Sequence, residues 1–126
     1  MIDLFTRFAV AVPVPDMSAQ TVIDAVLMKW FLVFGAPRRI HSDQGTNFES
    51  AAFGNFCALW NVMKSRTTAY HPAGNGACER VNQTLNRGVQ KILNEKNLEN
   101  WDLILPLAVF SYNSTVHSTT EFTPFI

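Results

Sequence analysis

The sequence predicts an α/β fold in which helices flank a mixed β-sheet. Short segments rich in β-branched and aromatic residues alternate with longer segments of helical periodicity. The chain opens with two such short segments in tight succession, which predicts an antiparallel hairpin and therefore a mixed sheet. Hydrophobic residues make up 48% of the 126 residues and charged residues 16%, enough apolar material for one buried core.

The first third of the chain predicts this hairpin and a long amphipathic helix. Residues 1–14 predict two short strands that are joined near Thr6 to Ala9 and closed by prolines. Ser18 suits the N-cap of a helix over residues 19–34, which a glycine and a proline then stop. Apolar residues at helical spacing give this helix one broad face that we expect to pack on the sheet. They are Ala19, Val22, Ile23, Val26, Leu27, Trp30, Val33 and Phe34.

The remaining elements alternate in the order expected for this class. A strand, a helix, a strand and a helix are predicted over residues 39–43, 50–61, 63–69 and 77–94. Residues 70–76 have the proline and glycine density of a flexible loop. Residues 101–113 are apolar almost all round, with Pro106 among them, which predicts a helix that is buried or lies at a subunit contact.

Charge and composition exclude several classes of protein. Lys plus Arg equals Asp plus Glu at 10 each, whereas free-standing DNA-binding modules are usually basic. Two cysteines without CxxC spacing predict neither a disulfide scaffold nor a zinc site. His41, His71 and His117 lack ligand spacing, so we expect them to form hydrogen bonds in loops and strands. Charges interrupt every long apolar run and no signal peptide is visible, so we expect an intracellular protein without membrane contact.

Asp43 and Glu79 are the carboxylates best placed for chemistry. Asp43 ends a predicted strand directly before a glycine turn, where side chains project from the sheet edge at which α/β proteins bind ligands. The same position suits a plain turn former. Glu79 lies in the first turn of a predicted helix, where the helix dipole alone gives a negative side chain a structural role.

The helix over residues 77–94 sorts its side chains into three stripes. At about 100° per residue, four amides project within about 60° of Glu79, next to a basic stripe and away from an apolar face. The amides are Asn82, Gln83, Asn86 and Gln90, the basic stripe is Arg80, Arg87 and Lys91, and the apolar face is Val81, Leu85, Val89 and Ile92. Amides and cations suit contact with bases and phosphates. Geometry alone leaves nucleic-acid contact and a solvated face equally open.

Two motifs taken together resemble one known family. HSDQGTNF at residues 41–48 and HPAGNGACERVNQTL at residues 71–85 are similar to the second and third active-site motifs of retroviral-type integrases, particularly those of gypsy-class retrotransposons. Asp43 and Glu79 are separated by 35 intervening residues, the spacing characteristic of that family. The opening IDLFTRFAVAVPVPD, the FGAPRRIHSDQG segment and the stretch from Trp101 to Pro124 also resemble it, so the whole chain is covered.

The resemblance implies an RNase H-like fold and a polynucleotidyl transferase that performs 3′-end processing and strand transfer for DNA integration. Three carboxylates hold two Mg²⁺ (or Mn²⁺) ions in that family, and Asp43 and Glu79 would be two of these catalytic metal ligands. The implied nucleic-acid contacts are Asn75, Asn82, Gln83 and Asn86. The implied flexible-loop residues are Tyr70, His71, Pro72, Gly74 and Gly76. The implied partners are retroelement ends and target DNA in the nucleus, and further copies of the chain in a homodimer or larger assembly.

We find no counterpart of the family's first metal-binding Asp, which lies on its first strand. Asp3 precedes a sequence that resembles the second strand, where we expect it to hydrogen-bond with Thr6 or Arg7. We therefore expect residues 1–126 to be a partial catalytic core without its first strand and without the C-terminal basic domain. Two carboxylates offer two Mg²⁺ ions too little charge and too few oxygens, so we expect weak metal binding and little activity from this polypeptide alone.

Two other functions stay open, and so does the question whether this polypeptide is an enzyme by itself. A non-catalytic protein derived from a retroelement integrase would keep the fold for nucleic-acid binding or dimerisation, and the apolar residues 101–112 support that alternative. A general RNase H-type nuclease would keep the fold but fits the HSDQG and GACER motifs poorly. An upstream reading frame that encodes a strand with an Asp would favour the enzyme.

Overall fold

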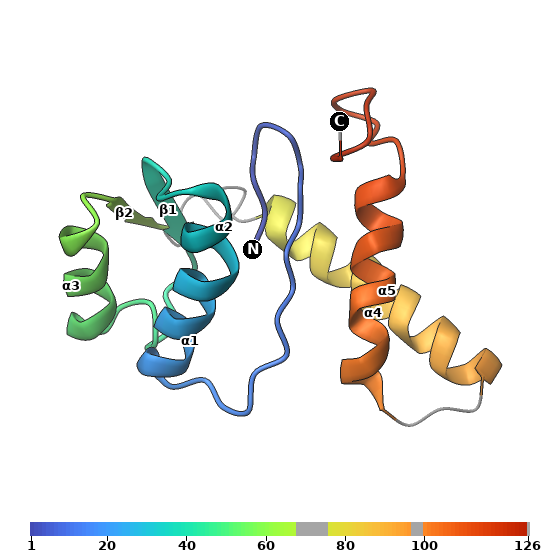
Figure 1. Ribbon diagram of the computed structural model, residues 1–126, viewed down its shortest axis with the longest axis horizontal. Coiled ribbons are helices and arrows are strands. Elements are labelled where there is room, and N and C mark those ends of the chain that lie inside the picture. The colour runs from blue at the N-terminus through green and yellow to red at the C-terminus, as the bar shows by residue number, and fades with distance from the viewer. Residues whose placement is uncertain (68–75, 97–99, 126) are drawn as a thin grey trace. The chain divides into compact units, whose positions relative to one another are not determined.

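The computed structural model describes residues 1–67, 76–96 and 100–125. The chain forms two compact units (Figure 1). Unit 1 comprises Met1–Pro13 and Gly76–Ile126, and unit 2 comprises Val14–Asn75. Among the described residues, no helix is both long and apolar enough to cross a membrane.

Unit 2 begins with the expected helix, built from three consecutive segments, α1 (Ala19–Val26), η1 (Leu27–Phe31) and α2 (Leu32–Phe34). Ser18 is the N-cap, as expected, and its hydroxyl accepts a hydrogen bond from the backbone N–H of Thr21. The C-cap is a glycine whose φ of 91° favours the residue without a Cβ.

The segment η1 is a π-helix, which the sequence analysis did not predict. The backbone N–H of Leu32 donates to the carbonyl of Leu27, five residues back. A π turn holds more residues than an α turn, so the side chains that follow rotate away from the original face. Phe31 is 4% exposed, while Val33 and Phe34 are 63% and 52% exposed. The prediction that Val33 and Phe34 belong to the buried face was therefore wrong.

The sheet of unit 2 consists of two parallel strands, β1 (Arg39–Ser42) and β2 (Met63–Arg66), with the helix α3 (Ala51–Leu59) between them in sequence. Both strands were predicted at these places, but they end one and three residues earlier than expected. The core of unit 2 is formed by residues of α1, η1 and α3 and by Val62, which precedes β2. It comprises Val22, Val26, Phe31, Phe53, Phe56, Cys57 and Val62.

Unit 1 opens with a ribbon whose two arms pair in antiparallel fashion through one bridge, between Ile2 and Ala9. The turn lies at residues 4–6, earlier than the predicted Thr6 to Ala9. Asp3 causes this shift because its carboxylate accepts hydrogen bonds from the backbone N–H and the hydroxyl of Thr6, at 2.9 and 2.6 Å. The expected structural role of Asp3 is thus confirmed. Within the described part of the chain, strand pairing amounts to this bridge and the parallel pair β1–β2, short of the mixed sheet that was expected.

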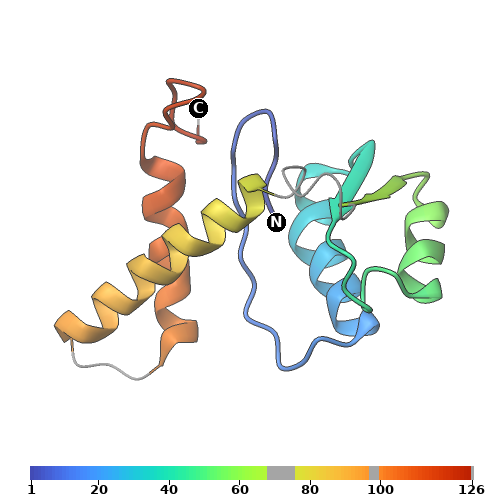
Figure 2. The ribbon, with the colours of Figure 1, turned by 180° about the vertical axis from the view of Figure 1, so that it is seen from behind.

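The helices α4 (Gly76–Lys96) and α5 (Trp101–Ser114) cross each other in unit 1 and enclose its core (Figures 1 and 2). The core comprises Ala9, Val81, Leu85, Val89 and Ala108, which confirms three of the four residues of the predicted apolar face of α4. The fourth, Ile92, is only partly buried. Asn113 is 2% exposed and joins α5 to the ribbon. Its amide side chain accepts from the backbone N–H of Ala9 and donates to the carbonyl of Ala9, both at 2.9 Å.

Only one side of α5 is buried. Ile104, Ala108 and Asn113 lie in the interior. Four large apolar side chains are at least half exposed, namely Trp101, Leu103, Leu107 and Phe110. Of the two predicted settings of this helix, complete burial within the chain is excluded, and a subunit contact stays a prediction.

Candidate functional site

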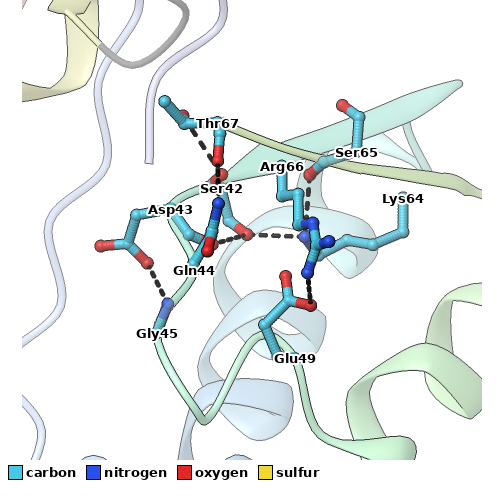
Figure 3. Close-up of polar contacts among 9 residues, drawn as sticks. All are labelled: Ser42, Asp43, Gln44, Gly45, Glu49, Lys64, Ser65, Arg66 and Thr67. Carbon is cyan, nitrogen blue, oxygen red and sulfur yellow. Dashed lines mark hydrogen bonds and ion pairs between the residues drawn. The ribbon is translucent and has the colours of Figure 1, made fainter. Parts of the chain in front are cut away.

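Asp43 follows β1 directly, so the end of the strand places its exposed side chain at the sheet edge. One carboxylate oxygen, Oδ1, accepts a hydrogen bond from the backbone N–H of Gly45 at 2.9 Å (Figure 3). Within the described part of the chain, Oδ2 accepts no hydrogen bond. Asp43 therefore acts as a turn former through one oxygen, while its other oxygen accepts no hydrogen bond from the described residues.

Gly45 is required by the close packing of this turn. A Cβ at this position would lie 3.0 Å from Oδ1 of Asp43 and 2.8 Å from Oδ1 of Asn47. Both distances are shorter than an ordinary carbon–oxygen contact, so a larger residue would have to move the side chain of Asn47 and would press on the Asp43 carboxylate. The glycine of the HSDQG motif thus serves the orientation of the aspartate.

The residues on either side of Asp43 are tied to the end of β2. The backbone N–H of Thr67 donates to the carbonyl of Ser42 at 2.8 Å, and the Gln44 amide donates to the carbonyl of Thr67 at 2.8 Å. The ring of His41 forms hydrogen bonds with the hydroxyls of Ser65 and Thr67, at 2.8 and 3.1 Å. This confirms the expected role of His41. Ser65 and Thr67 could not be predicted from the sequence, because only the register of β1 on β2 brings them here.

Two cations of β2 lie beside the same turn. The Lys64 ammonium is half-buried and donates to the hydroxyl of Ser42 at 2.6 Å and to the carbonyl of Ser65 at 2.8 Å. Burial lowers the pKa of Lys64, while the nearby carboxylates of Glu49 and Asp43 raise it. Arg66 forms a surface ion pair with Glu49 at 2.9 Å. The sheet end therefore carries positive charge close to Asp43.

Glu79 lies in the first turn of α4 and is exposed. Gly76, which the sequence analysis assigned to the flexible loop, is the first residue of that helix. The other loop residues, Tyr70, His71, Pro72 and Gly74, lie outside the described residues, as does Asn75. Asp43 and Glu79 belong to different units, so their approach to each other stays a prediction from the motifs.

The amide stripe of α4 is exposed, as its periodicity predicts. Beside it, unit 1 contains a groove of about 350 Å³. The groove is lined by Ala11, Val12, Asn82, Leu85, Asn86, Val89, Gln90, Trp101 and Leu105. Its walls thus combine amides with apolar side chains and with Trp101, a half-exposed indole that the sequence analysis had not assigned to a site.

The donor chemistry at Asp43 fits a hard divalent cation. Mg²⁺ prefers exposed carboxylate oxygens and keeps several waters, and Oδ2 of Asp43 is an oxygen of that kind. Of the residues that the structure describes, no three His, Cys, Asp or Glu side chains gather into a group that could hold a metal. Asp43 can therefore contribute one ligand, and the rest of any metal site must come from elsewhere.

Comparison with known proteins identifies related sequences over the whole chain. The family model described as integrase core domain matches residues 1–72. An uncharacterized protein of Caenorhabditis elegans is 35% identical over 118 residues, which are 94% of this chain and 9% of that protein. The retrovirus-related Pol polyprotein from transposon 412 of Drosophila melanogaster is 26% identical over 120 residues, or 95% of this chain and 10% of the polyprotein. The chain thus spans about a tenth of the length of these relatives.

Solved structures show the same fold. The simian T-cell lymphotropic virus intasome, in complex with PP2A regulatory subunit B56 gamma, contains a chain that matches with a TM-score of 0.88 and 22% identity over 98% of this chain and 45% of its own. The HTLV-2 integrase catalytic core domain in complex with magnesium matches with a TM-score of 0.82 and 22% identity, over 98% of this chain and 78% of its own. The predicted α/β, RNase H-like fold is therefore confirmed.

Proposed function

The chain belongs to the integrase core domain family, and from this membership we propose that it is part of the catalytic core of a retroelement integrase, a polynucleotidyl transferase for DNA integration. Its substrates are the DNA ends of the element and a target DNA in the nucleus. The observation that carries the proposal is Asp43 of the HSDQG motif, which stands at the end of β1 with Oδ2 directed to solvent and unbonded among the described residues.

The proposed chemistry is an in-line phosphoryl displacement. Asp43 and Glu79 would hold divalent ions, which supply an activated oxygen nucleophile and stabilise the leaving oxygen. Asp43 contributes Oδ2 while Oδ1 stays bonded to Gly45, so ligand binding leaves the turn intact. Glu79 contributes from the first turn of α4, where its side chain is exposed. Because a two-ion site needs further carboxylate oxygens, the polypeptide of residues 1–126 joins DNA poorly by itself.

The amide stripe and the basic stripe of α4 support DNA contact. Asn82, Gln83 and Asn86 are exposed, and so are the basic side chains that flank them. Amides can bond base edges while cations neutralise phosphates. The apolar floor and the indole of the adjacent groove add a surface on which a base can stack. Asn75 is also proposed to contact DNA, because it lies within the motif of residues 71–85.

Removing two amides from the stripe should weaken DNA binding without unfolding the protein. We expect Asn82→Ala combined with Asn86→Ala to lower the affinity for a duplex that carries a retroelement end by about fivefold to 150-fold. Each lost hydrogen bond accounts for about 0.5–1.5 kcal/mol. Fluorescence anisotropy with labelled duplex measures the change. Gln20→Ala, which removes an exposed amide from α1, is the matched control. Equal affinity of the double variant and the control would contradict the proposed contact.

The metal ligands can be tested by titration with Mn²⁺, whose paramagnetism broadens the NMR signals of nearby amides. We expect broadening at Gly45 and at residues around Glu79. We expect Asp43→Asn or Glu79→Gln to weaken Mn²⁺ binding by about fivefold or more, since a carboxylate–cation contact contributes on the order of 1–4 kcal/mol near a protein surface. Asp24→Asn is the control, because Asp24 is an exposed carboxylate of α1 whose side chain bonds only Gln20 among the described residues.

Two results would count against this assignment. Broadening around Gly45 that survives Asp43→Asn would exclude Asp43 as a ligand. Robust DNA joining by the wild-type polypeptide, abolished by Asp43→Asn, would overturn the expectation that residues 1–126 are nearly inactive alone.

A binding or dimerisation protein without catalysis is the second candidate, and the exposed apolar side of α5 favours it. Leu103, Leu107 and Phe110 follow one another at about one helical turn each and are 60–69% exposed. We propose that this side of α5 contacts a second copy of the chain in either candidate, as apolar patches of this kind mark interfaces. The non-catalytic candidate predicts association and DNA binding that persist in the Asp43→Asn variant and require no divalent ion.

A further inference from the structure

We propose that Lys64 and Ser42 form a hydrogen-bond relay that orients Asp43, so that Lys64 is a positioning residue of the site. The proposal deepens the proposed function and rests on it, because the orientation of Asp43 matters for catalysis only if Asp43 is a metal ligand. Nothing in the local sequence of β2 points to this role.

Three consecutive contacts define the relay. The Lys64 ammonium donates to Oγ of Ser42 at 2.6 Å, and the Ser42 hydroxyl donates to the backbone carbonyl of Asp43 at 2.9 Å (Figure 3). A second donor of the ammonium is held by the carbonyl of Ser65 at 2.8 Å. Lys64 is half-buried and Ser42 is 6% exposed, so little water competes for these groups.

The chemistry of the groups fixes the direction of the relay. An ammonium has three donors and no acceptor, so Ser42 must accept from Lys64. The single hydroxyl proton of Ser42 is then directed to the Asp43 carbonyl. Hydrogen bonds in such a chain polarise each other, and one that starts from a cation is stronger than a neutral one. The peptide that follows Asp43 is therefore held in one orientation.

The orientation of that peptide controls the carboxylate. The Asp43 carbonyl and the turn to Gly45 belong to the same short loop, and Oδ1 of Asp43 bonds the N–H of Gly45. A rotation of the peptide would carry this N–H away from Oδ1 and free the carboxylate to adopt other rotamers. Thr67 and Gln44 hold the neighbouring residues, but neither bonds Asp43 itself. The hydrogen bond from Ser42 at the end of the relay is the one that reaches the backbone of Asp43.

Alternatively, Lys64 could only connect β2 to β1 and stabilise the sheet, without any effect on the orientation of Asp43. Arg66 is the matched control, because it lies two residues further along β2 and forms only a surface ion pair with Glu49 among the described residues. Surface pairs of this kind contribute little to stability. If positive charge near the sheet end were sufficient, both cations would matter equally for the site.

The experiment uses the 126-residue chain with Lys64→Met, Ser42→Ala, Ser42→Thr and Arg66→Met. The hydrogen-exchange rate of the Gly45 amide, measured without metal, shows whether the Asp43 turn is intact. The Mn²⁺ titration measures how well Asp43 binds a divalent ion. We expect Lys64→Met and Ser42→Ala to speed exchange at Gly45 and to weaken Mn²⁺ binding by about tenfold, the lower range for partners of metal ligands. Ser42→Thr, which keeps the hydroxyl, and Arg66→Met should change affinity less than about twofold. Thermal unfolding confirms that each variant is folded.

The outcomes separate the relay from the proposed function. Unchanged Gly45 exchange and unchanged Mn²⁺ affinity in a folded Lys64→Met or Ser42→Ala variant would overturn the relay. Equal losses in Lys64→Met and Arg66→Met would also overturn it in favour of general charge. A wild-type chain without Mn²⁺ broadening at Gly45 would refute the metal-ligand role of Asp43, and the exchange of Gly45 would still decide whether the relay orients the turn.

Discussion

Replacing Asn113 with alanine is expected to destabilise the protein by about 2–6 kcal/mol. The side chain is 2% exposed and satisfies both the N–H and the carbonyl of Ala9, a residue that is itself 1% exposed. Alanine would leave both backbone groups buried and unpaired, and each such group costs about 1–3 kcal/mol. Because the two bonds join α5 to the ribbon, we expect the ribbon to lose its attachment first.

Urea unfolding monitored by circular dichroism measures this loss. Asn94→Ala is the control, since Asn94 is an exposed amide near the end of α4 and surface substitutions usually change stability by less than about 0.5 kcal/mol. Hydrogen exchange at the Ala9 amide gives a local readout of the same contact. A variant at Asn113 as stable as the Asn94 control would show that these bonds contribute nothing.

Replacing Phe53 with alanine should cost about 3–5 kcal/mol of unfolding free energy. Phe53 is 0% exposed, the most buried large side chain of unit 2. Its ring packs edge-on against Phe48 at 5.5 Å and lies 6.1 Å from the ring of Phe56. The substitution leaves a cavity below the turn that holds Asp43, because Phe48 belongs to that turn.

Phe5→Ala is the matched control for this substitution. The same atoms are removed, but Phe5 is 88% exposed, so the change in stability should stay within about 0.5 kcal/mol. Thermal and urea unfolding of both variants give the comparison. Similar stability of the two variants would mean that the core around Phe53 contributes far less than its burial suggests.

Capping residues and apolar periodicity predicted the helices correctly, because both depend on residues close together in the sequence. Ser18 caps its helix where the residue type predicts, and the apolar period of α4 matches the buried Val81, Leu85 and Val89. The turn of the ribbon was misplaced because Asp3 accepts from Thr6, a side-chain contact that outweighs the strand pattern. Burial and a subunit contact could not be told apart for α5, because apolar character does not reveal which side of a helix a neighbour covers.

The candidate site likewise has one part that neighbouring residues predict and another that depends on contacts between distant residues. The position of Asp43 at the end of a strand, before a required glycine, followed from residues next to one another. Lys64 and Thr67 were not found because the parallel register of β1 on β2 brings them to Ser42, the neighbour of Asp43, from more than twenty residues away in sequence. The approach of Glu79 to Asp43 depends on how two units meet, and it stays a prediction from the motifs.

The π turn of η1 makes the long helix of unit 2 tolerant of a change in length. A π turn accommodates one residue more than an α turn would, and here the surplus falls between Leu27 and Leu32. A chain one residue shorter at this point can close a regular helix and keep the cap at Ser18. The side chains beyond the deletion would then swing by about a quarter turn, given about 100° per residue. Length variation at this point therefore acts mainly on the apolar surface around Val33 and Phe34, and leaves the first two turns of the helix in place.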